Sequence, residues 1–499
     1  MSIDIRAIGR AGALGKPPRF VRWTMLFTSG VFFVFLTVAF LVYYLPLPGA
    51  WQLRWLIFAS LFFYSYEFPA LVLLLLLVAA TDVVVSRKII TSPQSKLWAV
   101  SGVAFNLAVL AFFKYNRLLA LTFPSLGGVA SEPVRLLLML PLPIGISFYI
   151  FHGISLLVDT LRDGPSRRDV SSARSFGEHA QKTLLYVSFF PQLIAGPIVK
   201  AHQFYPQIRR KAFRDIDWDG AITALIVGYF LKVVIADNMS QQTFWLAYPY
   251  FLNDSTLDLL GLLLGYSVQI FADFAGYSLI AIGLARLFGY NLPTNFLFPY
   301  ISESFSEFWT RWHMSLSSWL RDYLYFPLGG NRKGRLRTYL NLMIVMGLGG
   351  MWHGAAWSYG IWGLWHGAAL AIERMVVGPR SATARSLAIR ILRGALVFAV
   401  VTAGWLLFKL PHFGDVIAYL RTLFTNLHAE SNKPMDMLIL IYAIPVVAYH
   451  LNYLIKRRAR GLGRSYFLDG LARHIALGVL AAAIVLNPGP SKAFIYFQF

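Results

Sequence analysis

Long apolar runs separated by short basic loops set the pattern of this chain. Clear examples are residues 25–45, 71–85, 97–113, 259–288, 395–410, 437–454 and 471–486. Such runs approach or exceed the roughly 18 residues that indicate a transmembrane helix. We therefore predict an all-α integral membrane protein with about eleven to thirteen spanning or partly inserted segments of ~20 residues each.

The composition supports this class, since 57% of the 499 residues are hydrophobic and only 14% are charged. The formal charge of +22 could indicate nucleic-acid binding, but the basic residues sit in short loops between apolar runs, so a lipid bilayer is the expected partner and nucleic acid is not. The chain has no cysteine. Disulfides, thiolate metal sites and a thiol nucleophile are therefore excluded, no metal is expected, and a covalent acyl intermediate must use oxygen or nitrogen.

The basic loops also predict the topology, because short loops rich in Lys and Arg face the cytoplasm. They include residues 87–88, 162–174, 209–214, 331–337, 374–393 and 456–464. On this rule the polar loop 411–435 lies outside, and the final span, 471–486, leads outward. The last six residues, "FIYFQF" at 494–499, are then expected at the periplasmic side or folded back into the membrane from it. The basic tail 1–24 argues for a cytoplasmic N-terminus.

Residues 338–373 are flanked by basic loops on both sides, so this segment is predicted to enter the membrane and return as a helical hairpin. Its centre, "MGLGGMWHGAAW" at 346–357, contains four glycines that would permit a tight reversal. About 15 helical residues rise ~22 Å, which places the reversal deep in the bilayer with His353 at or near its tip. An ionisable group at that depth indicates function by default.

Residues 291–337 mix aromatic and charged positions and predict helices that lie in the interface or line a wet cavity. Three serines, Ser302, Ser304 and Ser306, are candidate N-caps, and His313 is a second candidate functional histidine. Four basic residues would make a cytoplasmic mouth positive and suit a phosphate-bearing donor: Arg311, Arg321, Arg332 and Lys333. The alternative is that these four are topological anchors.

Other polar residues of the apolar runs are assigned structural roles. His366 is expected to serve structure or the cytoplasmic mouth, and His152 to pack beside the site. Asp273 and Asp237 need buried partners. Walker, HExxH and GxSxG motifs do not occur in a fitting context, so nucleotide hydrolysis, zinc proteolysis and a serine-hydrolase elbow have no support.

Five blocks of the chain together resemble the membrane-bound O-acyltransferase (MBOAT) family, in its bacterial alginate O-acetyltransferase branch. They read "PLPIGISFYIF", "FFPQLIAGPIVKAHQFYPQI", "FADFAGYSLIAIGLARLFGYNLPTNFLFPY", "SFSEFWTRWHMSLSSWLRDYLYFPLGGNRKG" and "GGMWHGAAWSYGIWGLWHG". The likeness covers roughly residues 25–499. It implies an MBOAT-type membrane domain at 25–493, with a catalytic core segment at 300–375 and a C-terminal aromatic motif at 494–499.

The resemblance also implies an activity. Such a core is expected to have cytoplasmic and periplasmic funnels that meet in a narrow channel, and to move an acetyl group from cytoplasmic acetyl-CoA across the bacterial inner membrane. The family's embedded histidine matches His353, its second histidine matches His313, and its C-terminal tyrosine, an acyl relay, matches Tyr496. A periplasmic SGNH-hydrolase-type partner would complete O-acetylation of an exported polysaccharide, alginate-like or other. No permanently bound cofactor is expected.

The chemistry of these residue types fits an acyl relay. A histidine with an ordinary pKa near ~6.5 suits general-base catalysis. His313, Trp352 or backbone amides near Gly349 and Gly350 are candidates to stabilise the oxyanion. The phenol of Tyr496, with an ordinary pKa of ~10, makes an ester that stays activated relative to an alkyl ester. The alternative for the tail is an interfacial aromatic belt.

Three further alternatives stay open at this point. One is an acyltransferase with another donor, such as a D-alanyl or acyl carrier protein. Broken helices and midplane polar residues also describe a transporter. The last is a scaffold that recruits a periplasmic enzyme without catalysis of its own.

Overall fold

The computed structural model describes residues 25–47, 50–66, 69–122, 142–162, 168, 170, 173, 175–194, 196–377, 386–460 and 467–495. Within these residues every long element is a helix. The first half contains α1 (Gly30–Tyr43), α2 (Trp51–Ser65), α3 (Leu71–Thr91), α4 (Ser95–Thr122), α7 (Ile146–Leu161), α9 (Phe176–Ser188), α10 (Phe190–Leu193), α11 (Ala201–Phe204), α12 (Trp218–Tyr229), the π-helix η5 (Phe230–Ala236) and α13 (Asp237–Gln242).

The second half begins with α14 (Thr256–Leu287). It continues with α15 (Phe305–Arg311), α16 (Met314–Leu320), the π-helix η9 (Arg321–Tyr325), α17 (Arg335–His353), α18 (Trp357–Val377), α19 (Leu387–Lys409), α20 (Phe413–Thr425), α21 (Lys433–Arg460) and α22 (Phe467–Leu486). Short 3-10 turns η3 (Tyr205–Gln207), η4 (Phe213–Asp215), η6 (Thr243–Leu246), η7 (Tyr250–Asn253) and η8 (Pro299–Ile301) join some of these helices.

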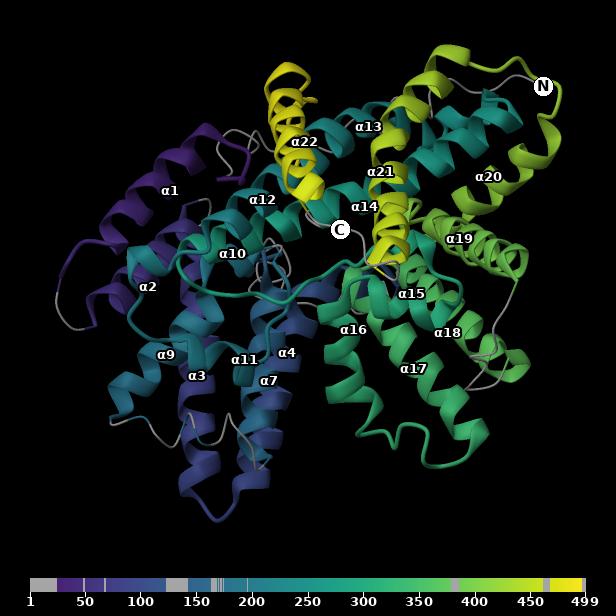
Figure 1. The fold of residues 1–499 in the computed structure, drawn as a ribbon. Coiled ribbons are helices and arrows are strands. Elements are labelled where there is room, and N and C mark those ends of the chain that lie inside the picture. The colour runs from purple at the N-terminus through teal and green to yellow at the C-terminus, as the bar shows by residue number, and fades with distance from the viewer. Residues whose placement is uncertain are drawn as a thin grey trace, which may run out of the picture.

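Helix α14 runs through the middle of the molecule (Figure 1). It begins at a capping box in which Ser255 and Asp258 each accept from the other's backbone amide, and nearly its whole length is buried. It contacts α10, α12, α13, α19, α20 and α21. The purple and blue N-terminal helices gather on one side of the molecule and the green helices α15 to α19 on the other (Figure 1).

The all-helical membrane architecture predicted from the apolar runs is confirmed for the described residues. Among the described residues, five segments are long and apolar enough to cross a membrane: Ser95–Asn116, Trp218–Leu246, Thr256–Leu287, Leu387–Lys409 and Lys433–Ile455. Shorter apolar helices cover Gly30–Tyr43, Ile146–Leu161 and Gly470–Leu486. The predicted total of about eleven to thirteen membrane segments stays a prediction.

The hairpin predicted between the basic loops is present, because α17 and α18 pack against one another and the chain reverses between His353 and Trp357. The predicted role of the glycines is only partly right. Gly354 alone among the four lies at the reversal, in an extended conformation, while the other three lie inside α17. Glycine inside the helix instead permits close packing: a Cβ on Gly350 would meet the Tyr359 carbonyl and lie 2.9 Å from Gly363 Cα.

Residues 411–435 were expected to form a polar loop, and this expectation is wrong in part. They contain α20, which begins after His412 and turns Val416, Tyr419 and Thr422 into the core. The Tyr419 hydroxyl donates to the Leu259 carbonyl at 2.6 Å. The apolar positions of α20 are too few to indicate a span, but they suffice to attach this segment to α14.

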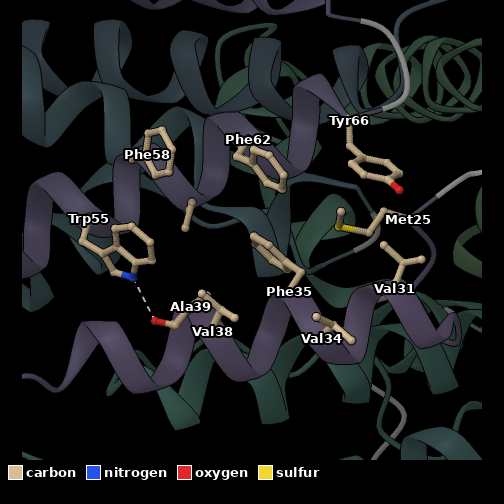
Figure 2. Close-up of a pocket in the computed structure, with 11 residues that line it drawn as sticks. Met25, Val31, Val34, Phe35, Val38, Ala39, Trp55, Phe58, Phe62 and Tyr66 are labelled. Carbon is tan, nitrogen blue, oxygen red and sulfur yellow. Dashed lines mark hydrogen bonds between the residues drawn. The ribbon is translucent and has the colours of Figure 1, made fainter.

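A groove of about 340 Å³ lies between α1 and α2 (Figure 2). Its lining is Met25, Val31, Val34, Phe35, Val38, Ala39, Trp55, Phe58, Ala59, Phe62 and Tyr66. The one indole nitrogen of this set, on Trp55, donates to the Ala39 carbonyl at 2.9 Å. The lining contains no histidine or carboxylate, so this apolar groove lacks the groups for acid–base chemistry.

The close contact between α17 and α18 predicts that Gly350→Ala destabilises the protein. Overpacking costs about 1–3 kcal/mol, which exceeds the ~1 kcal/mol that alanine gains over glycine in a helix. A lower melting temperature of the purified protein in detergent checks this. The matched control is Gly478→Ala in α22, where a Cβ meets no described atom within 4 Å. Equal melting temperatures for the two variants would contradict the prediction.

Candidate functional site

His353 occupies the tip of the hairpin, as the last residue of α17, and its side chain is 5% exposed. Three rings lie around its imidazole, with centroid distances of 5.2 Å to Trp352, 5.1 Å to Trp362 and 5.4 Å to Phe408. The His313 ring lies 6.2 Å away. The structure therefore brings the two histidines selected from the sequence together, and we call these five residues the histidine cluster.

His313 enters this cluster through a break between two short helices. Helix α15 ends before it and α16 begins after it, and its own backbone is left-handed, with φ 45° and ψ 50°. For a residue other than glycine this conformation costs roughly 1–2 kcal/mol. Such strain is typical of functional sites and persists only where the surroundings enforce it. Ser304 caps α15 by accepting from the Glu307 amide at 3.0 Å, as predicted, whereas Ser302 and Ser306 do not cap it.

Asn295 determines the orientation and the tautomer of His313. The Asn295 amide nitrogen donates to Ser278 Oγ at 3.0 Å, so its Oδ1 is the oxygen that faces His313 Nδ1 at 3.1 Å. Nδ1 must then carry the proton and donate, which leaves Nε2 with its lone pair. Ser315 donates to the same Oδ1 from its amide and its hydroxyl. The neutral His313 thus presents an acceptor, not a donor, at its second nitrogen.

Leaving His353 aside, three polar atoms of the histidine cluster make no hydrogen bond to any described residue. They are His313 Nε2, the acceptor, and two indole N–H donors, Trp352 Nε1 and Trp362 Nε1. All three side chains are buried. Of the oxyanion-stabilising groups considered from the sequence, the amides of Gly349 and Gly350 are unsuitable, because both lie inside α17 and are used by helical hydrogen bonds. Trp352 is the better candidate.

Helix α4 closes the end of α17 through two residues that the sequence analysis did not single out. Lys114, 7% exposed, donates from Nζ to the Trp352 carbonyl and, at 3.1 Å, to Ser147 Oγ. Tyr115 donates to the Met351 carbonyl at 2.7 Å. These carbonyls belong to the last turn of α17, where helical partners are missing and a cation is favoured. Lys114 directly follows the apolar run 97–113. A charged residue at that place in the sequence was the available signal for a buried role.

The other two histidines of interest are also buried. His366 is fully buried among aromatic rings, 4.9 Å from Trp362 and 5.1 Å from Trp309. It therefore belongs to the packing around Trp362, and not to an open mouth. His152 accepts from the Val199 amide at Nε2, 3.3 Å away, which agrees with its predicted structural role.

The four basic residues proposed for donor binding lie in different surroundings. Arg311 is paired with Glu307 at 2.9 Å and also donates to the Leu297 carbonyl. Arg321 is 58% exposed and pairs with Asp322. Arg332 and Lys333 are exposed in the segment before α17. The exposed three remain accessible to an anionic ligand, whereas Arg311 is buried as well as paired.

A further polar cluster lies beside Arg321. Asp322 accepts from Lys200 and, at its backbone carbonyl, from Arg162. Partial burial opposes ionisation of Asp322, but the hydrogen bonds from Arg321 and Lys200 outweigh it and hold the pKa of this carboxyl below its ordinary value. The stabilisation from this pairing is therefore present at neutral pH and is lost as the pH falls through the lowered pKa.

The C-terminal motif is described only in its first two residues. Phe494 and Ile495 are buried, and the Phe494 ring lies 4.5 Å from that of Tyr277 and 5.6 Å from that of Phe274. Tyr496 lies outside the described residues. The two buried aspartates noted from the sequence, Asp237 and Asp273, have found a common partner in Lys232.

The cap on α17 predicts that Lys114→Met destabilises the protein. The substitution keeps the volume but removes the donor to the buried Trp352 carbonyl, and an unsatisfied buried group costs about 1–3 kcal/mol. Lys96→Met is the matched control, because Lys96 lies on the same helix and is exposed. Thermal unfolding in detergent measures both, and an equal loss in the two variants would contradict the assigned cap.

Comparison with known proteins agrees with this arrangement. A model of the membrane-bound O-acyltransferase family matches residues 166–409, which include both histidines of the cluster. A probable alginate O-acetylase AlgI of Pseudomonas syringae pv. tomato is 34% identical over 466 residues, covering 90% of this chain and 86% of the relative. A protein of the same description from Azotobacter vinelandii is 37% identical and covers 77% of this chain and 75% of its own.

A second activity occurs among the relatives. A peptidoglycan O-acetyltransferase of Helicobacter pylori is 31% identical over 523 residues, covering 96% of this chain and 98% of its own. Relatives at more than 30% identity thus span most of both chains. The chain is therefore a multi-pass membrane O-acyltransferase and belongs to the membrane-bound O-acyltransferase family.

Proposed function

We propose that this enzyme takes an acetyl group from cytoplasmic acetyl-CoA and passes it across the inner membrane for O-acetylation of an exported polysaccharide. The observation that carries the proposal is the histidine cluster, in which His353 and His313 lie 6.2 Å apart in buried surroundings. Relatives named as O-acetylases and O-acetyltransferases support acetyl as the group transferred. Because the chain is an O-acyltransferase, the transporter and scaffold alternatives are set aside.

In the first step, His353 accepts the proton of an attacking hydroxyl. The hydroxyl oxygen bonds to the thioester carbon, and the carbonyl oxygen becomes an oxyanion, for which the indole N–H groups of Trp352 and Trp362 are available donors. Collapse of this intermediate breaks the carbon–sulfur bond. The CoA thiolate leaves and takes up the proton held by His353.

His313 has a supporting role in this scheme. Its Nδ1 proton is engaged by Asn295, so Nε2 can accept a hydrogen bond or a proton but cannot donate while the ring is neutral. This orientation suits a residue that aligns the attacking hydroxyl. It disfavours His313 as the oxyanion donor, which was one of the candidates from the sequence.

The attacking hydroxyl in our proposal is the phenol of Tyr496. The product is an aryl ester, which remains activated because a phenol with an ordinary pKa of ~10 is a better leaving group than an alcohol. In the second step an alcohol attacks this ester, the phenolate leaves, and the proton of the alcohol restores the phenol. The burial of Phe494 and Ile495 beside Tyr277 supports an inward course of the tail and is unlike a lipid-facing aromatic belt.

The two ends of the reaction lie on opposite sides of the membrane in this proposal. Arg321, Arg332 and Lys333 are exposed and suit the phosphates of acetyl-CoA. A periplasmic partner of the SGNH-hydrolase type would receive the acetyl group and transfer it to the polysaccharide. Relatives named for alginate and for peptidoglycan support the proposal that the final acceptor is an extracytoplasmic polysaccharide.

His353→Ala is expected to lower the rate of acetyl transfer by about 10²–10⁴-fold, because the general base is removed. The measurement uses ¹⁴C-acetyl-CoA and the purified enzyme in proteoliposomes. His412→Ala, an exposed histidine, is the control. Unchanged transfer by a folded His353→Ala enzyme would refute its catalytic role. Transfer from an acylated carrier protein but not from acetyl-CoA would favour the alternative donor.

Tyr496→Phe keeps the aromatic ring and removes the acceptor oxygen, so we expect polysaccharide acetylation to be lost while the protein stays folded. Mass spectrometry of the C-terminal peptide from wild-type enzyme, after incubation with acetyl-CoA, is expected to show an added acetyl group on Tyr496. Full acetylation of the polymer by the Tyr496→Phe enzyme would overturn the relay.

A further inference from the structure

A buried ion cluster lies where η5 and the start of α13 meet the middle of α14. Lys232 Nζ is 2.7 Å from Asp237 Oδ1 and 2.8 Å from Asp273 Oδ1, and these side chains are between 1% and 5% exposed. Lys232 belongs to η5, Asp237 begins α13 and Asp273 lies in the middle of α14. We call these three residues the ion cluster.

The ion cluster also binds the backbone of the C-terminal segment. Lys232 Nζ donates to the Lys492 carbonyl at 3.0 Å, and the Ile495 amide donates to Asp273 Oδ2 at 2.7 Å. The Asp273 carboxylate therefore accepts from Lys232 at one oxygen and from the Ile495 amide at the other. Hydrogen bonds to ionised groups are stronger than those between neutral groups, so both contacts hold the tail firmly.

The π-helix η5 and the first turn of α13 supply two more contacts with the C-terminal segment. A π turn disturbs the regular pattern of helical hydrogen bonds, and such turns are frequent at functional sites. Here the Val233 carbonyl accepts from the Gly489 amide at 2.9 Å. Asn238, one turn further on, donates to the Asn487 carbonyl at 3.3 Å. The tail is thus held at four backbone positions between 487 and 495.

Protein stability alone does not explain why three charged residues are buried in the ion cluster. Three charged residues are expensive to bury, and well-packed apolar side chains can often replace such a triad without loss of stability. Charged residues inside a membrane domain are for that reason functional candidates. Beyond one another, these charges reach the C-terminal segment at the Lys492 carbonyl and the Ile495 amide, which lie four residues and one residue before Tyr496 in the chain.

The attached segment leads directly to the histidine cluster. Phe494 packs on Phe274 with a centroid distance of 5.6 Å, and Phe274 packs on His313 at 4.6 Å. A single ring therefore separates the described end of the tail from His313. The peptide bond from Ile495 joins this fixed point to Tyr496.

We propose that the ion cluster is a dock that positions the C-terminal segment and presents Tyr496 to the histidine cluster. This inference rests on the proposed function, because it assigns a task to the dock only if Tyr496 carries the acyl group. Asp273 is the key positioning residue, since it alone pairs with Lys232 and also accepts from the Ile495 amide.

The test is Asp273→Asn in the full-length enzyme. Asparagine has the same size, but its NH2 group must then face either Lys232 or the Ile495 amide, which are both donors. We expect the rate of ester formation on Tyr496 from acetyl-CoA, followed by mass spectrometry, to fall at least tenfold. The control is Asp219→Asn, which makes the same change at an exposed aspartate that pairs with Arg473 of α22 at 2.8 Å.

A thiol reporter separates docking from folding and from activity. The chain has no cysteine, so Gln498→Cys introduces a single thiol in the tail. In the Asp273→Asn background this thiol should react with maleimide at least several times faster than in the wild-type background, while the melting temperature stays within a few degrees. An unchanged labelling rate together with wild-type ester formation would overturn the dock.

A milder variant covers the case in which Asp273→Asn does not fold. Asn238→Ala removes the contact with Asn487 and leaves the ion cluster intact. Compared with Asp273→Asn, this variant should give a smaller increase in the rate of thiol labelling and a smaller decrease in ester formation. Wild-type values for both measurements would count against the dock. Absence of an ester on Tyr496 in wild-type enzyme would instead overturn the relay, and the labelling rates would still decide whether the tail is docked.

Discussion

The close contact of α17 with α18 is the constraint on which the rest of this site depends. It has no room for a side chain at Gly350 of α17 or at Gly363 of α18, and the two helices can meet this closely because both positions lack one. Their meeting brings the end of α17 to Trp362 of α18, and so fixes His353 among aromatic rings. His313, on a separate pair of short helices, can then approach from the other side.

Two buried lysines complete this arrangement in the same way. Lys114 binds the Trp352 carbonyl, next to His353, and Lys232 binds the Lys492 carbonyl, shortly before Tyr496. Each lies in an apolar run and each reaches a backbone group from a distant segment. Inside a membrane domain water does not compete for these carbonyls, so a lysine that finds one is strongly held. In the sequence, His353 directly follows a backbone carbonyl held by a buried lysine, and Tyr496 comes four residues after another.

The sequence predicted the membrane helices, the hairpin and the position of His353 at its tip, because apolar length and basic loops follow directly from the energetics of insertion. It also pointed to His313, and Asp237 and Asp273 were recognised as needing a partner. Spacing along the chain could not show that their partner is Lys232, since the pairing depends on the π turn of η5 and on how α14 packs against it.

Other features also lay beyond sequence reasoning. The sequence assigned the glycines of α17 to the reversal of the chain. Glycines that break a helix and glycines that let two helices pack closely give the same sequence pattern, so the sequence could not distinguish the two roles. Asn295 carries no charge and lies in a loop of mixed polar and apolar residues, so nothing in its surroundings marked it as the partner of His313. The cap formed by Lys114 depends on a contact between α4 and α17 that no local signal encodes.

The left-handed backbone at His313 has a consequence for how such a chain changes over time. Glycine adopts this conformation freely and asparagine tolerates it, so either residue would relieve strain at this position while removing the imidazole. Selection for stability and selection for chemistry therefore act in opposite directions on one residue. A relative that has lost its acyl-transfer reaction would be expected to drift toward glycine or asparagine here, which makes the identity of this residue a marker for whether the chemistry is still maintained.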